Sequence, residues 1–362
     1  MNITPRRAAA GVAALCVALL AACGKETSEG SMVTTPSATT TMLEIRGAGS
    51  TFAAPLIYRW IREYRTVEPA VSFQYAAVGS GEGIERFVTG GVDFAASDAA
   101  MNDAEIARVQ PPAGRGVTLI PVTAGEVVIA HQIPGFTGEL HLPRDVYADI
   151  FLGRITRWDD PRIVVANPDG RFPSKRIQVI ARRDSSGTTF AFTNHLSAIS
   201  PAWRDGPGKG KLIDWPGGAM TALGNEGIAQ RLRITQYAIG YLEYGFARRL
   251  GLPMAVLENR VGAFVAPGAT GGRAALDAAT QNIPEDLRLF LPDPAGADAY
   301  PIVSLTWLLL HASYPVPAKA GALRQALEWE LGQGQSIAEE MGYIPLPETL
   351  IGRARRALDE VR

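Results

Sequence analysis

Two kinds of hydrophobic spacing alternate along this 362-residue chain. Every second residue is apolar in Val71, Phe73 and Tyr75, as in a half-buried strand, whereas residues 56–64 have the three-to-four spacing of one helix face. Further strand-like runs lie at residues 117–122, 127–130, 177–180, 239–242 and 302–310, and further helix-like runs at 84–88, 190–196 and 323–329. This alternation predicts an α/β fold.

Three of the predicted strand-to-helix junctions are rich in glycine and hydroxyl residues. They are Gly47-Ala48-Gly49-Ser50-Thr51-Phe52, Gly79-Ser80-Gly81 and the segment from Arg182 through Phe190. Free N–H groups at a helix start carry partial positive charge and favour an anion, and glycine lets the backbone approach a ligand closely. One Gly-Ser turn is usually only a turn, but three junctions of this kind indicate a site for a small oxyanion. A fourth junction, Gly224-Asn225-Glu226-Gly227, has less hydroxyl content.

The third junction contains charges of both signs. Arg182 adds a fixed fork of donors, and its position beside Ser186, Gly187 and Thr188 favours a ligand role over a solvated surface role. Asp184 would repel an anion. It is interpreted either as a helix N-cap or as a residue that orients Arg182.

Asp98 also has two interpretations. It could cap a helix near Asp103, or it could be a buried acceptor in an anion site. A carboxylate can accept the proton of hydrogen phosphate, whereas sulfate has no proton to donate near neutral pH. Facing two acceptors against each other is costly, so one aspartate could discriminate between these ions.

The N-terminus predicts export from the cytoplasm. Residues 1–22 combine Arg6 and Arg7 with an apolar stretch too short to span a bilayer, and Cys23 follows as in a lipobox. The expectation is a lipoprotein signal peptide, lipidation of Cys23 and a disordered tether at residues 23–42; the alternative is a plain signal peptide with an incidental cysteine. The later sequence contains no segment typical of a transmembrane helix.

Composition excludes several other functions. Removal of residues 1–22 changes the formal net charge from −1 to about −3, which argues against a nucleic-acid binder. The four histidines lack metal-ligand spacing, and the only other cysteine lies inside the signal peptide, so no metal, cofactor or disulfide is expected. A nucleophile elbow and a P-loop are also absent from the sequence.

Several motifs occur together in one order. Besides the four junctions, they are Val92-Asp93-Phe94 with Ser97-Asp98, Phe151-Leu152-Gly153-Arg154-Ile155 with Trp158-Asp159, Ile239-Gly240-Tyr241-Leu242-Glu243-Tyr244 and Gly342-Tyr343-Ile344-Pro345-Leu346-Pro347. In these motifs the chain, from about Leu43 to its C-terminus, resembles the substrate-binding lipoproteins of bacterial phosphate ABC transporters, the PstS family. The resemblance implies a two-lobed, type II-like periplasmic-binding-protein fold with the ligand in the cleft between the lobes.

The resemblance also implies domains, a site and partners. Lobe one would comprise residues 43–125 and 301–362, and lobe two residues 126–300. The residues implied to bind phosphate are Thr51, Phe52 through its backbone, Ser80, Asp98, Arg182, Ser186, Gly187 and Thr188, with Asp184 steering Arg182. The implied partners are inorganic phosphate, permease subunits with a cytoplasmic ATPase, and the membrane through the lipid of Cys23, facing the periplasm or the cell exterior.

Two alternatives and two departures from the family pattern remain. The alternatives are a secreted phosphatase, although the resemblance implies a protein that is not an enzyme, and a binder of another oxyanion on the same scaffold. Glu82 and Ala53 stand where the family mostly has a small residue and a proline. An inward Glu82 would weaken anion affinity, whereas an outward one would only favour the helix dipole.

Overall fold

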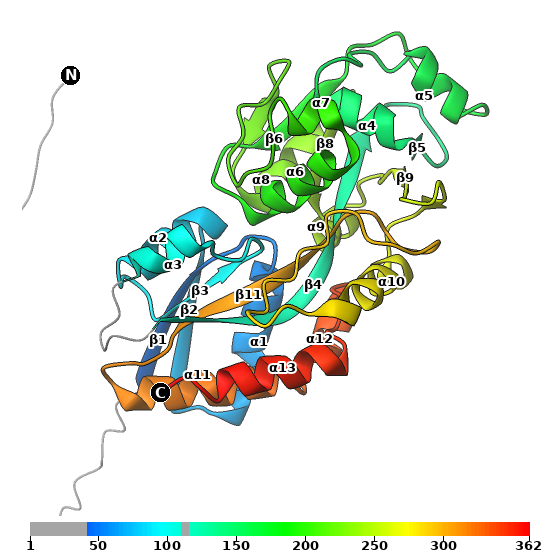
Figure 1. Cartoon of the computed structure of the whole chain (residues 1–362). Coiled ribbons are helices and arrows are strands. Elements are labelled where there is room, and N and C mark those ends of the chain that lie inside the picture. Colours follow the sequence, from blue (N-terminus) through cyan, green and yellow to red (C-terminus); the bar gives the residue numbers. More distant parts are fainter. Residues whose placement is uncertain (1–41, 110–115) are drawn as a thin grey trace, which may run out of the picture. The chain divides into compact units, whose positions relative to one another are not determined.

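The structure is a computed structural model and describes residues 42–109 and 116–362. Its main feature is an eight-stranded sheet with the order β2-β1-β3-β11-β4-β8-β6-β7 (Figure 1). In that order the strands are Val71–Ala77, Leu43–Gly49, Phe94–Ser97, Val303–His311, Val117–Gln132, Ala238–Glu243, Gln178–Arg182 and Met220–Ala222. Strands β1, β2 and β3 are parallel, as are β6, β7 and β8, whereas β4 is antiparallel to both of its neighbours.

Strand β4 belongs to both halves of the sheet. It pairs with β11 as far as Glu126 and with β8 from Val127 onward. The two separate strands expected at residues 117–122 and 127–130 are therefore one strand of 16 residues, because residues 123–126 stay paired with β11. We call the half with β1, β2, β3 and β11 lobe 1 and the half with β6, β7 and β8 lobe 2. The predicted lobe boundaries at residues 125/126 and 300/301 stay a prediction.

Within the described residues, six helices complete lobe 1. They are α1 Ala54–Val67, α2 Ser80–Val88, α3 Asp103–Arg108, α11 Pro317–Leu331, α12 Gly334–Met341 and α13 Glu348–Leu358. In α1 a proline lies at the start, and Leu56, Ile57 and Trp60 are buried on one face, which confirms the helix predicted from their spacing.

Lobe 2 contains the helices between β4 and β9 and a second, small sheet. The helices are α4 Arg144–Phe151, α5 Pro161–Ala166, α6 Gly187–Ile199, α7 Pro201–Arg204, α8 Gly224–Ile234 and α9 Tyr244–Arg249. The small sheet has the order β10-β9-β5, with strands Phe264–Val265, Val256–Glu258 and His141–Leu142. Helix α10 (Ala269–Ala279) and the 3-10 helix Thr280–Asn282 follow, and α10 contacts β4 and β11.

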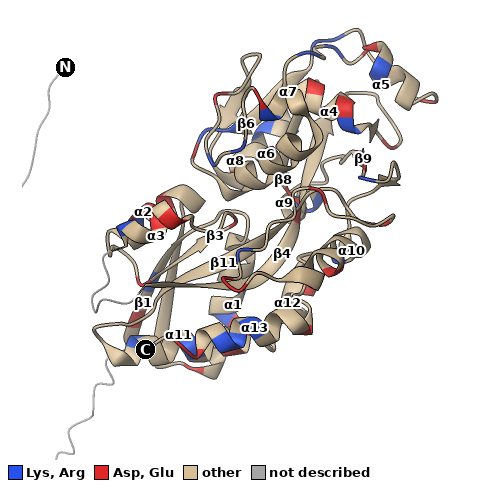
Figure 2. Cartoon of the chain, viewed as in Figure 1, with Lys and Arg blue, Asp and Glu red and all other residues tan. Residues whose placement is uncertain are grey.

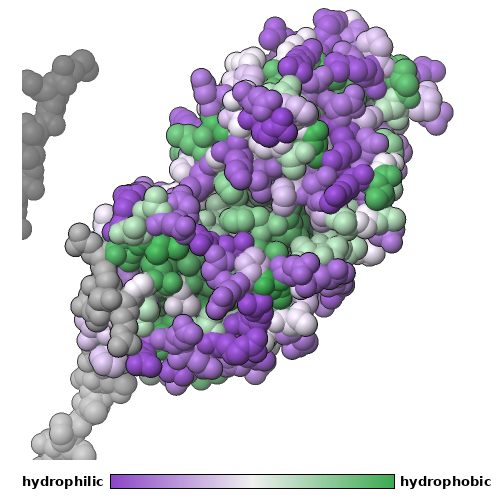
Figure 3. All heavy atoms as spheres, in the orientation of Figure 1, coloured by the Kyte–Doolittle hydropathy of each residue, from purple (hydrophilic) through white to green (hydrophobic). Residues whose placement is uncertain are grey.

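The sheet places the helix starts of interest at one edge of each lobe. Helices α1 and α2 follow β1 and β2 directly, and α6 and α8 follow β6 and β7. The carboxyl ends of parallel strands are the usual location of ligand sites in α/β proteins. In the space-filling view, hydrophilic residues cover much of the visible face, and hydrophobic residues are visible between the lobes, around β4 and α9 (Figure 3).

The predicted signal peptide, Cys23 and all but Met42 of the predicted tether lie outside the described residues. Within residues 42–109 and 116–362, no helix combines the length and the hydropathy that crossing a bilayer requires.

Candidate anion-binding site

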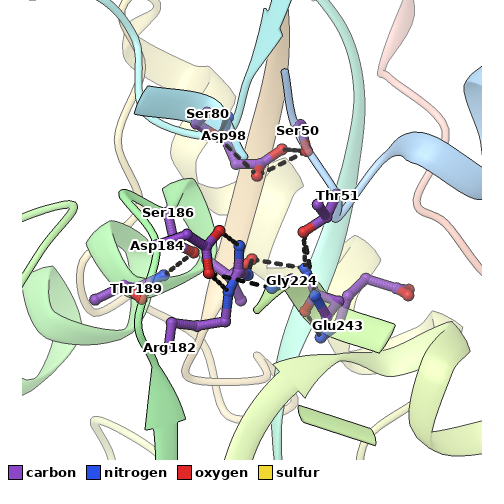
Figure 4. A network of polar contacts seen from close by, with 12 residues as sticks. Ser50, Thr51, Ser80, Asp98, Arg182, Asp184, Ser186, Thr189, Gly224 and Glu243 are labelled. Atoms are coloured by element: carbon purple, nitrogen blue, oxygen red, sulfur yellow. Dashed lines mark hydrogen bonds and ion pairs between the residues drawn. The ribbon is translucent and has the colours of Figure 1, made fainter. Parts of the chain in front are cut away.

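The lobe 1 wall of the site is built around Asp98, which directly follows β3. The Ser50 hydroxyl lies 2.7 and 2.8 Å from the two carboxylate oxygens of Asp98, and the Ser80 hydroxyl lies 3.3 Å from Oδ2. The Thr306 hydroxyl on β11 donates to Oδ1 at 2.8 Å. All four side chains are buried. Figure 4 shows Ser50 and Ser80 converging on Asp98.

This environment sets the protonation of Asp98. Burial raises the pKa of the carboxyl from its ordinary 3.8 to about 6, while the hydrogen bonds from Ser50 and Thr306 and the charge of Arg182 act in the opposite direction. The carboxylate is therefore ionised at neutral pH, with hydroxyl donors in place of water. It can act as an acceptor there.

The lobe 2 wall is built around Arg182, the last residue of β6. Its side chain is buried, so the alternative of a solvated surface arginine is wrong. Arg182 Nε donates to Asp184 Oδ1 at 2.8 Å, and Nη2 is paired with Asp184 Oδ2. The Gly224 N–H donates to the same carboxylate at 3.1 Å. Burial alone would raise the pKa of Asp184, but the hydrogen bonds and charge of Arg182 outweigh it and lower that pKa. Asp184 thus fixes one edge of the guanidinium fork (Figure 4).

The capping alternatives for both aspartates are wrong. The N-cap of α6 is Ser186, whose hydroxyl accepts the Thr189 N–H at 3.0 Å. The N-cap of α3 is Asn102, which forms a capping box with Glu105. Neither Asp98 nor Asp184 caps a helix, so both carboxylates are available to other polar groups of the site.

The start of α6 lies against the lobe 1 wall. A Cβ atom added to Gly187 would lie 2.5 Å from Ser80 Oγ and 2.7 Å from Asp98 Oδ2, distances that real Cβ atoms do not tolerate. Only glycine allows this approach. The free N–H groups of the first turn of α6 therefore lie close to the Asp98 carboxylate.

Asn225, at the start of α8, connects the two walls. Its side-chain amide donates to the Thr51 hydroxyl at 3.1 Å and to the Thr188 hydroxyl at 3.0 Å. The Asn225 backbone N–H also donates to Thr51, at 3.2 Å. The Asn225 side-chain oxygen accepts the Glu243 N–H at 2.9 Å, which fixes the orientation of the amide.

The structure thus brings the sequence-predicted residues together at one place between the lobes. Phe52 lies there with its ring buried and its carbonyl accepting the Tyr343 hydroxyl at 2.7 Å. Three polar residues were not predicted. Ser50 and Asn225 belong to junction motifs that were recognised, whereas Thr306 lies in an apolar run without any local signal.

Glu82 points away from this site. Its side chain is 52% exposed and forms a salt bridge of 2.8 Å with Arg86, one turn further along α2. The outward alternative is therefore the correct one, and Glu82 favours the α2 dipole without entering the cleft.

The arrangement suits an oxyanion that carries a proton. One wall offers an arginine, hydroxyls and helix N–H groups, and the other offers hydroxyls and a carboxylate acceptor. Among the described residues, no group of three histidine, cysteine or acidic side chains could hold a metal ion. Fold and site together define a two-lobed binding protein of the periplasmic type with a buried candidate site for an anion.

Comparison with known proteins gives the family. A family model described as the PBP superfamily domain matches residues 34–329. The phosphate-binding protein PstS of Pasteurella multocida is 35% identical over 314 residues, covering 86% of this chain and 89% of that protein. PstS of Methanocaldococcus jannaschii is 36% identical over 337 residues, covering 88% and 86%. The chain belongs to the PstS family of phosphate-binding proteins.

Solved structures agree in fold. A high-affinity periplasmic phosphate-binding protein bound with phosphate, PfluDING, matches with a TM-score of 0.70 and 22% identity, covering 87% of this chain and 93% of that one. A phosphate-binding protein from Stenotrophomonas maltophilia matches with a TM-score of 0.68 and 20% identity, covering 86% and 93%.

Proposed function

We propose that this protein binds inorganic phosphate outside the cytoplasmic membrane and delivers it to an ABC-type import complex. The observation that carries the proposal is the buried Asp98 carboxylate, held by Ser50 and Thr306 opposite Arg182 and the start of α6. This pairing of an acceptor with strong donors fits an anion that carries a proton.

Binding works by exchange of water for fixed donors. The lobes close about β4, the strand shared by both, and enclose the anion between Thr51, Ser80 and Asp98 on one side and Arg182, Ser186, Gly187 and Thr188 on the other. Donors held in place by Asp184 and Asn225 need no rearrangement when the anion arrives. The protein makes and breaks no bond in this role, so it is a binding protein and not an enzyme.

Membrane attachment and transfer complete the proposal. A lipid on Cys23 anchors the chain, and residues 24–42 connect this anchor to lobe 1. The closed lobes present their paired faces to the permease subunits, and a cytoplasmic ATPase drives uptake. Metabolic labelling with a fatty acid, compared between wild type and Cys23→Ser, tests the anchor.

Calorimetry with phosphate, sulfate and molybdate tests the ligand. We expect tight phosphate binding and sulfate binding weaker by at least about 100-fold, because sulfate leaves Asp98 facing an acceptor. Tight sulfate binding would contradict the acceptor role of Asp98. Release of phosphate from a phosphomonoester, lost in Ser80→Ala, would instead support a phosphatase.

A further inference from the structure

A salt bridge crosses the cleft beside the anion site. The Lys211 ammonium, in the lobe 2 loop between α7 and β7, is paired with Glu105 Oε1 on α3 of lobe 1. The side chains are only 18% and 15% exposed. If the lobes separated, the pair would break, and each charge would return to water.

The loop that contains Lys211 is hydrogen-bonded to α6, the helix whose start lines the proposed anion site. Its carbonyl oxygen accepts the N–H of Ser186, the N-cap of α6, at 2.7 Å. The neighbouring Gly210 N–H donates to the Thr193 hydroxyl within α6 at 3.1 Å. The loop and the start of α6 therefore move as one piece, so the position of the ammonium reports the position of the anion-binding turn.

Glu105 is fixed just as firmly on the opposite lobe. Its Oε2 accepts the Asn102 N–H at 3.0 Å in the capping box of α3, which leaves Oε1 for Lys211. One carboxylate thus closes a helix cap and reaches across the cleft.

Lys211 is surrounded by acidic side chains of both lobes. A hollow of about 410 Å³ lies beside the salt bridge, at the edge of the cleft between the lobes. Its charged lining residues are Glu82, Glu85 and Glu105 from lobe 1 and Asp184 and Lys211 from lobe 2. Figure 2 shows acidic residues gathered on α2 and α3. Lys211 is the only lysine or arginine among the described residues that line this hollow. The other carboxylates of this hollow have arginine partners of their own, so Glu105 is the one that would be left without a cation on closure if Lys211 were absent.

We propose that Lys211 and Glu105 form a latch that stabilises the closed lobes and holds Ser186 and the α6 start in place. The latch rests on the proposed function, because it acts on closure around phosphate. Both are positioning residues and do not touch the anion. A backbone hydrogen bond of 2.9 Å from Gly81 N–H to the Ser185 carbonyl joins the lobes at the same edge.

A double-mutant cycle tests the latch. Lys211→Met, Glu105→Gln and the double variant are compared by phosphate calorimetry and by stopped-flow measurement of phosphate release. Glutamine retains the capping box, so Glu105→Gln removes the charge and leaves α3 capped. Arg204→Met and Asp205→Asn, an exposed ion pair of lobe 2 that does not line this hollow, are the matched controls.

We expect each latch variant to raise the Kd for phosphate by about 3- to 10-fold, mostly through faster release. The Kd of the double variant should not exceed that of the single variant with the higher Kd, because the interaction between the two residues is lost only once. Lys211→Arg should recover most of the affinity, and the control pair should change the Kd by less than about twofold.

Three outcomes would overturn the latch. If Lys211 only attracts phosphate at a distance, Glu105→Gln will tighten binding and the two effects will add without coupling. If neither variant changes release while wild type binds phosphate, the latch is wrong and the proposed function stands. A wild-type protein that binds no phosphate overturns the proposed function and the latch with it.

Discussion

The side-chain amide nitrogen of Asn225 lies 3.1 Å from the hydroxyl oxygen of Thr51, across the cleft between the lobes. The Asn225 backbone N–H donates to the same oxygen. A hydroxyl has two acceptor positions and one proton, so two incoming donors leave the Thr51 proton to point elsewhere. Thr188 is in the same position, since its oxygen accepts from Asn225 and from Arg182 Nη1. Asn225 thereby leaves the protons of both hydroxyls available to donate in the proposed phosphate site.

Asn225→Asp should therefore abolish tight binding. A carboxylate at this position would accept the protons of Thr51 and Thr188 and would add a negative charge beside the anion. We expect the Kd for phosphate to rise by at least about 100-fold, a loss of roughly 2.7 kcal/mol. Calorimetry measures the change, and Asn282→Asp, the same substitution at an exposed position, is the control. Retained affinity would show that the two hydroxyl protons are not oriented by Asn225.

Gly187→Ala should block closure without unfolding the protein. The added methyl group meets Ser80 Oγ and Asp98 Oδ2 only when the lobes are together. We expect a phosphate Kd higher by more than about tenfold and a melting temperature of the ligand-free protein within a few degrees of wild type. Small-angle scattering with and without phosphate tests whether the variant still compacts. Normal compaction with normal affinity would contradict the close approach of α6.

Asp184→Asn separates orientation from charge. The substitution makes the site more positive, so simple electrostatics predicts tighter phosphate binding. The pairing of Asp184 with Arg182 and Gly224 predicts the reverse, because the guanidinium fork loses its fixed edge. We expect binding weaker by about tenfold, measured against Asp205→Asn on the surface as the control. Tighter binding would exclude the orienting role.

Much of this site could be predicted from the sequence, because its donors lie in short motifs at helix starts. The junction motifs that contain Thr51, Ser80, Arg182 and Gly187 could be recognised without knowledge of the fold, and the family resemblance then implied the individual residues. Thr306 could not be found this way. It lies in a mostly apolar strand, and only the antiparallel pairing of β11 with β3 brings it to Asp98. The unbroken path of β4 was missed for a related reason, since pairing with two different strands leaves no mark in the local pattern.

Asp98→Asn should reduce selectivity more than total anion binding. The amide can offer an N–H to sulfate, whereas the carboxylate cannot. We expect the ratio of sulfate to phosphate Kd values to fall by at least about tenfold at neutral pH, with phosphate still bound through Arg182 and the start of α6. Sulfate and phosphate are titrated in competition with each other on one fluorescently labelled form of each variant, which gives the ratio of their Kd values directly. An equal loss for both anions would remove the proton-sensing role from Asp98.

Selectivity should also depend on pH, through the pKa of about 6 to which burial raises Asp98. A folded-state pKa above the ordinary 3.8 means that the folded protein holds this proton more tightly than the unfolded chain does between about pH 4 and 6. Above that window Asp98 is an acceptor and excludes sulfate. Below about pH 6 the protonated carboxyl can donate to sulfate, so the sulfate-to-phosphate Kd ratio should fall as the pH drops through about 6.

Thr306→Val removes a donor that stabilises the ionised carboxyl, which raises the pKa of Asp98 further and shifts the midpoint of this change upward. Kd ratios measured at several pH values from about 4.5 to 8 test the shift, and Thr221→Val, at an exposed strand position, is the control. The titration of phosphate itself affects every variant alike, so a midpoint that is identical in wild type and Thr306→Val would contradict the role given to the Thr306 hydroxyl.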